Sequence, residues 1–390
     1  MLLSVIALVA IALIFDFTNG FHDAANSVAT VVATRALPAR WAPAFAAFFN
    51  FLAYFVIGTA VANTVAKTVK TEFAGQSVIF AALFAAIAWN YVTWRFGMPS
   101  SSSHAIIGGL VGAGLAAGGT AAISLDSVSK AAIGIAASPI AAIVIAFGAM
   151  YLVAGLQRLF RLHDNHPAFK GAQLLSSAAL SFGHGANDAQ KTMGVIAALL
   201  LGAGYTSVGS DGKTVEVPEW VAVSAYGAIA MGTLWGGWKI IETMGLKITT
   251  LHANSGVAAN IGATMAVFGA TSVGMPISTT HATAGSVIGA GVGSGRGANW
   301  RIVGEMLIAW ILTIPATAAL AAATLWLTRL PTVWAWITVG LLVASFGGWA
   351  LAAMLNTVHA ADVEAEIPSE TELAEDEPVR PHLSGHGPVS

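Results

Sequence analysis

Apolar runs close to the length of a membrane-spanning helix recur along this chain from Leu2 to Leu355. A helix needs roughly 20 apolar residues to cross the hydrocarbon core of a bilayer. Only 9% of the 390 residues are charged and 56% are hydrophobic, which leaves too few charges to cover a soluble surface. We therefore predict an all-α, polytopic membrane protein with about ten to twelve transmembrane segments. The run from Leu2 to Phe15 starts the first of them.

Lysine and arginine residues in the short loops predict the orientation. With the N-terminus outside, nine of them lie in cytoplasmic loops and five in outer loops, which is the direction that the positive-inside rule favours. We therefore expect a multi-pass protein of the cell inner (plasma) membrane with its C-terminal tail in the cytoplasm.

The last segment, residues 356–390, differs in composition from the rest of the chain. It holds eight acidic residues against one basic residue, Arg380, together with Pro, Ser and Gly. Such a segment has too little apolar surface to form a core. We expect an acidic, disordered C-terminal tail that is separate from the membrane segments.

Two stretches of the sequence repeat in the same order. Ten of the 18 residues from Gly97 to Gly114 recur at an offset of 177, and five positions around Asp23 recur around Asp188 at an offset of 165. Repetition of this kind predicts two copies of one structural unit. In the predicted topology the copies cross the membrane in opposite directions, as in transporters built from inverted repeats with broken helices. The predicted units are residues 1–157 and 171–355, joined by a cytoplasmic loop at 158–170.

Each copy places an aspartate in a polar, glycine-containing segment, where we expect the helix to break. The segments read Asn19-Gly20-Phe21-His22-Asp23-Ala24-Ala25-Asn26 and His184-Gly185-Ala186-Asn187-Asp188-Ala189-Gln190-Lys191. A carboxylate at membrane depth costs on the order of a few kcal/mol or more, so it indicates a functional site. The candidate substrate ligands are Asp23, Asn26, Asn187 and Asp188, with His22 and Lys191 in supporting roles. Alternatively, each aspartate caps the helix after its break, and Lys191 forms a structural ion pair with Asp188 three residues before it.

A loop rich in Ser and Thr precedes a glycine-spaced apolar helix in each copy. In Pro99 to His104 and in Pro276 to His281, hydroxyl groups lie next to the unpaired N–H groups of a helix start, an arrangement that binds anions. Two inverted copies would direct two such helix starts at one central anion. The candidate substrate ligands here are Ser101, Ser102, Ser103, Ser278, Thr279 and Thr280. Ordinary capping by these hydroxyls is the alternative, and His104 and His281 could be ligands, proton carriers or residues that hold the loops.

These motifs resemble those of the Pit family of inorganic phosphate transporters, which includes sodium-phosphate symporters. The two aspartate segments look like the family's duplicated Gly-Ala-Asn-Asp signature, and the two hydroxyl loops look like its hairpin tips. The resemblance covers the chain apart from the acidic tail. It implies two inverted repeats with re-entrant, Ser/Thr-rich hairpins that bind phosphate.

Two departures from the family's pattern bear on the coupling ion. The first copy reads Phe21-His22-Asp23 where many members have Ala-Asn-Asp, and the second has Gln190-Lys191 where sodium-coupled members have a small residue and Asn. Both departures look like the bacterial low-affinity branch. That resemblance implies use of the proton gradient and acceptance of phosphate complexed with a divalent metal, and it puts a sodium site near Lys191 in doubt.

Electrostatics independently favours a co-transported cation. Phosphate is an anion near neutral pH, so two ionised aspartates facing it in a low-dielectric cavity would repel it strongly. A proton on Asp23 or Asp188, or a metal ion held by the two, removes this repulsion. We therefore predict a secondary active transporter that imports inorganic phosphate by symport with H⁺, a divalent metal or Na⁺, and we expect no cofactor.

Two other functions are alternatives to phosphate transport. A cation transporter would use the paired aspartates alone, with the hydroxyl loops as packing. An intramembrane hydrolase needs a nucleophile, base and acid placed asymmetrically around one scissile bond. The groups here come in matched pairs, and the chain has no cysteine nucleophile, so we expect that it is not an enzyme. The expected partners are phosphate and the lipid bilayer, with a homodimer left open and no nucleic acid.

Overall fold

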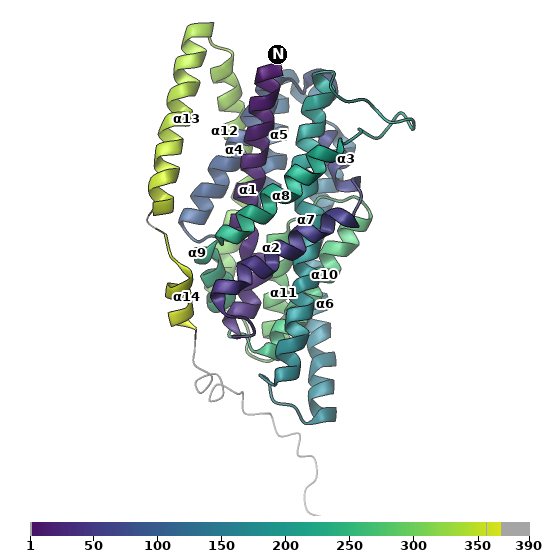
Figure 1. The fold of residues 1–390 in the computed structure, drawn as a ribbon, viewed down its shortest axis with the longest axis vertical. Helices are drawn as coiled ribbons and strands as arrows, with labels where there is room; N and C mark the ends of the chain where they lie inside the picture. Colours follow the sequence, from purple (N-terminus) through teal and green to yellow (C-terminus); the bar gives the residue numbers. More distant parts are fainter. Residues whose placement is uncertain (1, 356, 368–390) are drawn as a thin grey trace, which may run out of the picture.

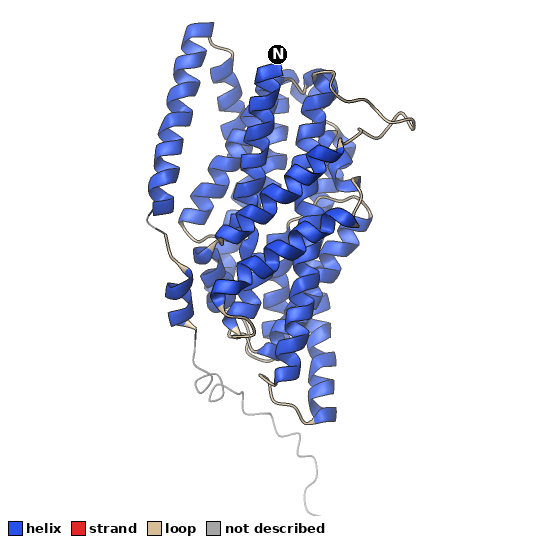
Figure 2. Ribbon diagram, in the orientation of Figure 1, coloured by secondary structure: helices blue, strands red, loops and turns tan. Residues whose placement is uncertain are grey.

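The computed structural model describes residues 2–355 and 357–367. Most of these residues are helical, and loops connect the helices (Figure 1, Figure 2). The described part contains fourteen α-helices. Their bounds are α1 (Leu2–Ala33), α2 (Ala42–Leu52), α3 (Ala60–Ala66), α4 (Gln76–Arg95), α5 (Ser102–Gly118), α6 (Leu125–Phe160), α7 (Pro167–Gly202), α8 (Glu219–Trp235), α9 (Trp238–Glu242), α10 (Ala253–Ser272), α11 (Thr279–Gly293), α12 (Trp300–Thr328), α13 (Thr332–Leu355) and α14 (Ala360–Glu366). The predicted all-α class is confirmed.

Six helices in the described chain are long and apolar enough to cross a bilayer, namely α1, α4, α5 with the turn after it, α6, α12 and α13. The pair formed by α2 and α3, bent by 88°, would make a seventh. The protein is therefore polytopic. α7 and α10, with 36 and 20 residues, are long enough to cross a bilayer but are less apolar, because they bury many polar side chains inside the bundle.

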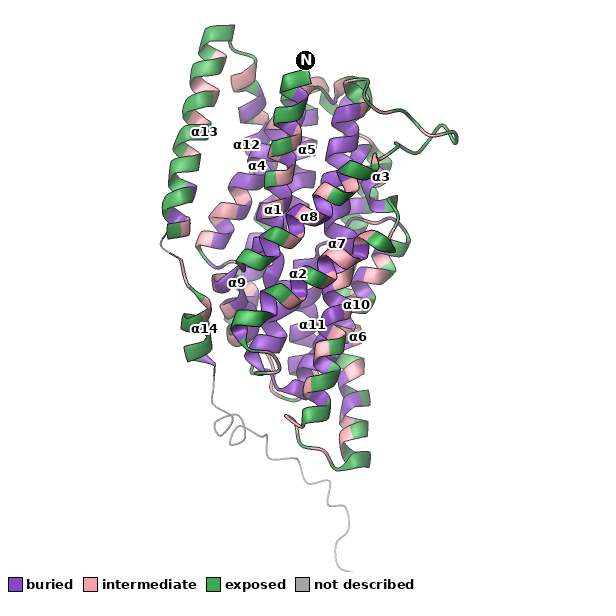
Figure 3. Cartoon of the chain, viewed as in Figure 1, coloured by how far each residue is buried: buried purple, intermediate pink, exposed green. Residues whose placement is uncertain are grey.

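α1 and α7 form the centre of the bundle, and α13 stands at its side (Figure 3). Nearly every residue of α1 from Phe15 to Ala33 is buried, as is nearly every residue of α7 from Leu180 to Leu200. α13 exposes most of its length, with only Ala350 and Ala353 buried. Polar residues in the middle of α1 and α7 therefore face other helices of the protein.

The predicted helix breaks at the two aspartates are wrong. α1 continues without interruption through Asp23, and α7 continues through Asp188. The glycines allow close helix packing instead. A Cβ on Gly20 would lie 2.2 Å from a carbonyl oxygen of α8, and one on Gly185 would lie 2.3 Å from a carbonyl oxygen of α2. Glycine permits such close approach between helices without interrupting either of them.

The chain turns back at the two hydroxyl loops. Residues 96–101 join α4 to α5, residues 273–278 join α10 to α11, and the helices of each pair pack against each other. Gly97 and Gly274 occupy the same place in the two loops and have φ angles of +64° and +68°, a left-handed conformation that glycine adopts readily. The repeated sequence thus folds into a repeated helical hairpin.

Each hairpin also packs against a long helix of the other half. α5 lies against α12, where a Cβ on Gly108 would come within 2.3 Å of Thr317 Oγ1. α11 lies against α6, where a Cβ on Gly285 would come within 2.7 Å of the Pro139 carbonyl oxygen. Glycines at equivalent places in the repeat therefore make equivalent close contacts.

The connection between the halves is the loop 161–166, which lies inside the predicted 158–170. Asp164 accepts hydrogen bonds of 2.8 Å from Arg296 Nη2 and from Gln157 Nε2. Burial alone would raise the pKa of Asp164. The hydrogen bonds and the guanidinium charge outweigh burial, so this pKa lies below its usual value.

Part of the segment predicted to be disordered is ordered. The helix α14 lies beside the end of the bundle opposite the N-terminus (Figure 1), and Val363 and Ile367 are buried there. Arg35 Nη2 donates a 2.9 Å hydrogen bond to the Ile367 carbonyl oxygen. The prediction of disorder is wrong for α14 because Val363 on the helix and Ile367, the residue directly after it, are buried against the bundle. Residues 356 and 368–390 of the predicted tail lie outside the described residues.

Candidate functional site

Four elements meet at the two aspartates: the middles of α1 and α7 and the first turns of α5 and α11. Asp23 is 1% exposed and Asp188 is 0% exposed. Thr279 of α11 lies between them, with its Oγ1 atom 3.5 Å from Asp23 Oδ2 and 3.4 Å from Asp188 Oδ2. These contacts are long, and one hydroxyl proton can serve one carboxylate at a time. The fold therefore brings the two repeated aspartates into one buried site.

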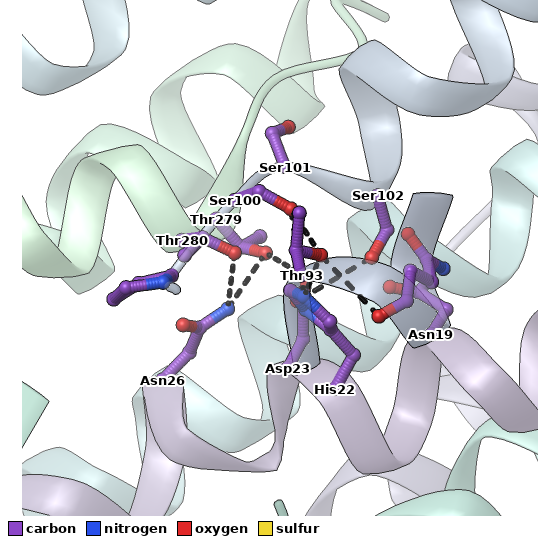
Figure 4. Close-up of polar contacts among 12 residues, drawn as sticks. Asn19, His22, Asp23, Asn26, Thr93, Ser100, Ser101, Ser102, Thr279 and Thr280 are labelled. Atoms are coloured by element: carbon purple, nitrogen blue, oxygen red, sulfur yellow. Dashed lines mark hydrogen bonds and ion pairs between the residues drawn. The ribbon is translucent and has the colours of Figure 1, made fainter. Parts of the chain in front are cut away.

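Asp23 is joined to α4 and to the first hairpin. His22 Nδ1 lies 2.6 Å from Asp23 Oδ1, and His22 Nε2 lies 3.0 Å from Thr93 Oγ1 of α4. Ser100 donates a 2.8 Å hydrogen bond to Thr93, and Ser102 donates a 3.4 Å hydrogen bond to Asp23 Oδ1. Figure 4 shows these side chains converging on Asp23. The immediate partner of this carboxylate is thus a histidine.

Asp188 has a different partner. Lys191 Nζ lies 2.6 Å from Asp188 Oδ1 and also donates a hydrogen bond to Ser103 Oγ at the start of α5. The ion pair that the spacing on α7 allowed is therefore present. The other carboxylate oxygen, Oδ2, accepts a 3.4 Å hydrogen bond from Asn19 Nδ2 and lies 3.7 Å from His184 Nε2. Lys191 links this half of the site to the hairpin of the other half.

The fixed charges around Thr279 do not balance. Asp23 and Asp188 are carboxylates and Lys191 is an ammonium group, which leaves one negative charge without a fixed partner when the histidines are neutral. All three side chains are buried. Because charges interact strongly where water is excluded, a proton or a metal ion would be favoured here, and a lone anion would be opposed.

Two of the six predicted hydroxyl ligands cap helices. Ser101 Oγ accepts a 3.1 Å hydrogen bond from the backbone N–H of His104, and Ser278 Oγ accepts one of 3.1 Å from that of His281. Ser101 points away from Asp23 in Figure 4. For these two residues the capping alternative describes the observed contact. The hydroxyls that follow them in each loop face the polar groups of α1 and α7.

The two asparagines of the repeat also differ. Asn26 Nδ2 donates hydrogen bonds of 3.2 Å to Thr279 Oγ1 and to Thr280 Oγ1, which ties α1 to the second hairpin. Asn187 Nδ2 donates a 2.9 Å hydrogen bond to Thr271 Oγ1, and Asn187 Oδ1 accepts one of 3.4 Å from the Ile277 backbone. Asn26 thus contacts the hydroxyls at the carboxylates, whereas Asn187 holds the loop between α10 and α11.

His104 and His281 meet where the two hairpins touch. Their ring centroids lie 4.3 Å apart with nearly perpendicular planes, and His281 also stacks on Trp310 of α12 at 3.8 Å. Within the described residues, neither ring nitrogen of His104 has a hydrogen-bond partner. The two rings therefore form a packing contact between the halves.

Sequence reasoning assigned no role to four side chains that the structure places in the site, namely Asn19, Thr93, Ser100 and His184. Asp16, which also had no assigned role, is buried on α1 outside the site. His184 lies four residues before Asp188, so the helical spacing could have found it once the helix is known to continue. Asp16 is a charge at the end of an apolar run, which is itself a signal. Thr93 belongs to another helix, and no local pattern connects it to His22.

A group of three side chains fits a divalent cation. Asp23, His184 and Asp188 each offer a ligand atom, and these atoms lie within 4.8 Å of one another. Carboxylate and imidazole groups are ordinary ligands of divalent transition metals, and carboxylates also bind Mg²⁺. Because Lys191 occupies Asp188 Oδ1, a metal would bind Oδ2, which has only long contacts with Asn19 and Thr279 and lies 3.7 Å from His184 Nε2. The sequence had indicated the two carboxylates without the histidine.

A model of the phosphate transporter family matches residues 19–321 of this chain. The chain belongs to the phosphate transporter family. A probable low-affinity inorganic phosphate transporter from Rhizobium meliloti is 46% identical over 322 residues, which cover 81% of this chain and 94% of the relative. One of the same description from Bacillus subtilis is 40% identical over 326 residues, which cover 83% of this chain and 96% of the relative. The resemblance to inorganic phosphate transporters is confirmed.

The fold is similar to that of a solved phosphate transporter. A structure described as the sodium-dependent phosphate transporter aligns with a TM-score of 0.75 and 27% sequence identity, covering 84% of this chain and 99% of that chain. The family match includes both aspartate segments and both hydroxyl hairpins. Membership of a transporter family favours transport over an intramembrane hydrolase.

Proposed function

We propose that this protein is a secondary active transporter that imports inorganic phosphate together with a cation. The observation that carries the proposal is the meeting of Asp23 and Asp188 beside the first turns of α5 and α11. Those turns offer hydroxyl groups, unpaired N–H groups and the positive ends of two helix dipoles, which suit an anion. The carboxylates suit a cation. In a phosphate transporter family member, phosphate is the anion that fits this pairing.

The proposed coupling cation is a proton, with phosphate also carried as a complex with a divalent metal. Phosphate adds one or two negative charges to a site that already has an unbalanced carboxylate, so the cation must enter with it. A proton on a buried carboxylate of α1 or α7, or a metal at Asp23, His184 and Asp188, would supply that charge. Lys191 supports this choice over Na⁺ at Asp188, since its ammonium group already occupies one oxygen of that carboxylate.

We infer that the two halves are inverted repeats that move against each other during transport. The matched packing of α5 on α12 and of α11 on α6 supports the inference, as does that of α1 on α8 and of α7 on α2. Because both aspartates are buried, phosphate reaches them only after a movement of the helices, which rocking of the halves would provide. We also propose that the two halves together cross the membrane in ten to twelve segments, with the N-terminus outside.

Uptake of radiolabelled phosphate into proteoliposomes tests the function. We expect accumulation when the outside is more acidic than the inside, and more of it when Mg²⁺ is added. Liposomes without protein are the control, and liposomes with Asp23→Asn should lose the added effect of Mg²⁺. Absence of phosphate uptake under every combination of pH gradient, Mg²⁺ and Na⁺ would contradict the proposal.

A cation transporter is the second candidate, and the cluster of Asp23, His184 and Asp188 favours it. Uptake of radioactive Mn²⁺ with and without phosphate separates the two. Metal uptake that requires phosphate supports transport of a complex. Metal uptake at full rate without phosphate, in a protein that does not carry phosphate, would establish the alternative.

A further inference from the structure

Asp16 is a buried carboxylate that the proposed phosphate site does not use. It lies on α1 seven residues before Asp23, and its side chain is 0% exposed. Among the described residues, neither of its carboxylate oxygens accepts a hydrogen bond. An ionised carboxylate in this state is very unfavourable, whereas the neutral acid avoids most of that cost. The geometry therefore favours a carboxyl group that holds a proton.

Among the described residues, its surroundings offer hydroxyl and amide groups and no unpaired positive charge. Thr192 of α7 and Asn19 of α1 lie next to it, and Tyr226 of α8 is its aromatic neighbour. All three are buried, and within the described residues neither Thr192 Oγ1 nor the Tyr226 hydroxyl oxygen has a hydrogen-bond partner. The nearby ammonium group, that of Lys191, is already paired with Asp188 at 2.6 Å. In the described part of the chain no fixed cation therefore remains to neutralise Asp16.

The helices packed on α1 contribute few other titratable groups here. Asp188 and Lys191 of α7 act on Asp16. On α4, Tyr91 packs against Phe21, which lies more than one turn after Asp16 on α1, and its hydroxyl donates a hydrogen bond to Met354 Sδ. Tyr91 is therefore not a neighbour of Asp16. Around Asp16 the ionisable neighbours are thus an internal ion pair and the Tyr226 phenol.

The Tyr226 side of Asp16 faces the end of the bundle that holds the N-terminus. Tyr54 packs edge-on against Tyr226 at 6.0 Å, and its hydroxyl donates a 2.9 Å hydrogen bond to the exposed Glu219. A cavity of about 390 Å³ lies at the end of the bundle that holds the N-terminus. Its lining comes from α1, α7 and α8, the three helices that surround Asp16, and from the loop between α7 and α8. On α1 the cavity ends at Val9, about 10 Å from Asp16 at 1.5 Å per residue.

We propose that Asp16, with Thr192 and Tyr226, is a proton-binding site separate from the two aspartates that face phosphate. The carboxylate takes a proton from the cavity at the N-terminal end, becomes a neutral carboxyl group, and releases the same proton on the other side when the helices reorient. The proposal rests on the proposed function, because it assigns the coupling proton to this residue. It leaves Asp23, His184 and Asp188 to hold phosphate or its metal complex.

The test uses the full chain in proteoliposomes, with Asp16→Asn as the variant and Asp126→Asn as the matched control on the exposed start of α6. Asparagine imitates the neutral carboxyl group and cannot exchange a proton. Two assays are run: exchange of phosphate at equal pH, and accumulation under an inward gradient of one pH unit. The second should concentrate phosphate about tenfold if one proton moves per cycle.

We expect Asp16→Asn to keep phosphate exchange and to lose the roughly tenfold accumulation, while Asp126→Asn and Asp16→Glu keep both. An Asp16→Asn protein that still accumulates phosphate like the wild type would overturn the assignment. If Asp16→Asn loses accumulation driven by a Na⁺ gradient but keeps accumulation driven by a pH gradient, the assignment is also overturned, because the site would then hold Na⁺. A wild type that neither exchanges nor accumulates phosphate would reject the proposed function, without deciding the proton site.

Infrared difference spectroscopy decides the proton site independently of transport. A protonated carboxyl group gives a carbonyl band that shifts in D₂O, and this band should be present in the wild type and absent from Asp16→Asn. If Asp16→Asn does not fold, Thr192→Val and Tyr226→Phe should shift the same band by changing its neighbours. An identical spectrum in the wild type and in every variant that folds would overturn the proposal.

Discussion

Asp23 and Asp188 come from the same repeated motif, yet they have different partners at the same distance. His22 Nδ1 lies 2.6 Å from Asp23, and Lys191 Nζ lies 2.6 Å from Asp188. The buried ammonium group needs its carboxylate, because either charge alone would be costly inside the bundle. A histidine, in contrast, can be neutral or charged near neutral pH. The duplication thus supplies one permanently paired carboxylate and one whose partner can change.

The largest expected effect is that of Asp188→Asn. This change leaves the Lys191 ammonium group buried without a counter-charge, which should cost about 3–5 kcal/mol of stability. We expect a large fall in the melting temperature of the purified protein and loss of phosphate uptake. The double variant Asp188→Asn/Lys191→Met is the control, since it removes both charges and should recover stability without uptake. An Asp188→Asn protein as stable as the wild type would show that the pairing is not obligatory.

Asp23→Asn should destabilise the protein less. It removes a charge-assisted hydrogen bond of about 1.5–3 kcal/mol, but His22 can remain neutral beside an asparagine. We also expect uptake to lose its response to added Mg²⁺, because the metal group at Asp23, His184 and Asp188 loses a ligand. Melting temperatures measured alongside those of Asp188→Asn check the order. Equal destabilisation by the two substitutions would remove the proposed difference between the halves.

Gly20→Ala and Gly185→Ala test a feature that the two halves share, the close packing of a glycine against a neighbouring helix. The added Cβ atoms would lie 2.2 Å and 2.3 Å from backbone oxygens of α8 and α2, so each should cost about 1–3 kcal/mol through overpacking. Similar falls in melting temperature are expected for both. Gly148→Ala is the matched control, because a Cβ at Gly148 meets no heavy atom within 4 Å. Strong destabilisation by only one of the two would mean that the repeats pack differently at their centres.

The smallest effect is expected for Asp164→Asn, which lies outside the site and gives a baseline for the comparison. Asparagine keeps one acceptor oxygen for Arg296 or Gln157, so the change should cost about 0.5–1.5 kcal/mol at neutral pH. Since the pKa of Asp164 is lower in the folded state, its contribution is present above the unfolded pKa and disappears as the pH falls through the folded pKa. Melting curves at decreasing pH should therefore converge for variant and wild type. A difference that stays constant with pH would contradict this account.

Features that depend on one helix or one loop can be predicted from the sequence. The spacing of Asp188 and Lys191 anticipated their ion pair, and the repeated loops anticipated two hairpins with Gly97 and Gly274 at equivalent turns. The helix breaks were misread because a glycine in a polar segment has two explanations. It marks either an interruption or a close approach to another helix, and at Gly20 the choice depends on α8, more than 190 residues away in the sequence.

The tail was misread for a related reason. Its many acidic residues indicated disorder, but the burial of Val363 and Ile367 depends on a surface that the rest of the chain provides. The composition of a segment describes its own solubility and says little about a surface elsewhere that accepts two of its side chains. In the same way, Thr93 could not be connected with His22, because the contact joins two helices whose packing no local pattern describes.

Composition, apolar run lengths and internal repetition were enough to establish a helical membrane protein with paired aspartates and paired hydroxyl loops, because these properties depend on residues that are counted or are close in sequence. Which atoms meet was settled only in the folded bundle. Thr279 comes between two carboxylates, and Lys191 reaches the hairpin of the other half. Such contacts join residues 88 to 256 positions apart, and they depend on how every helix between them packs.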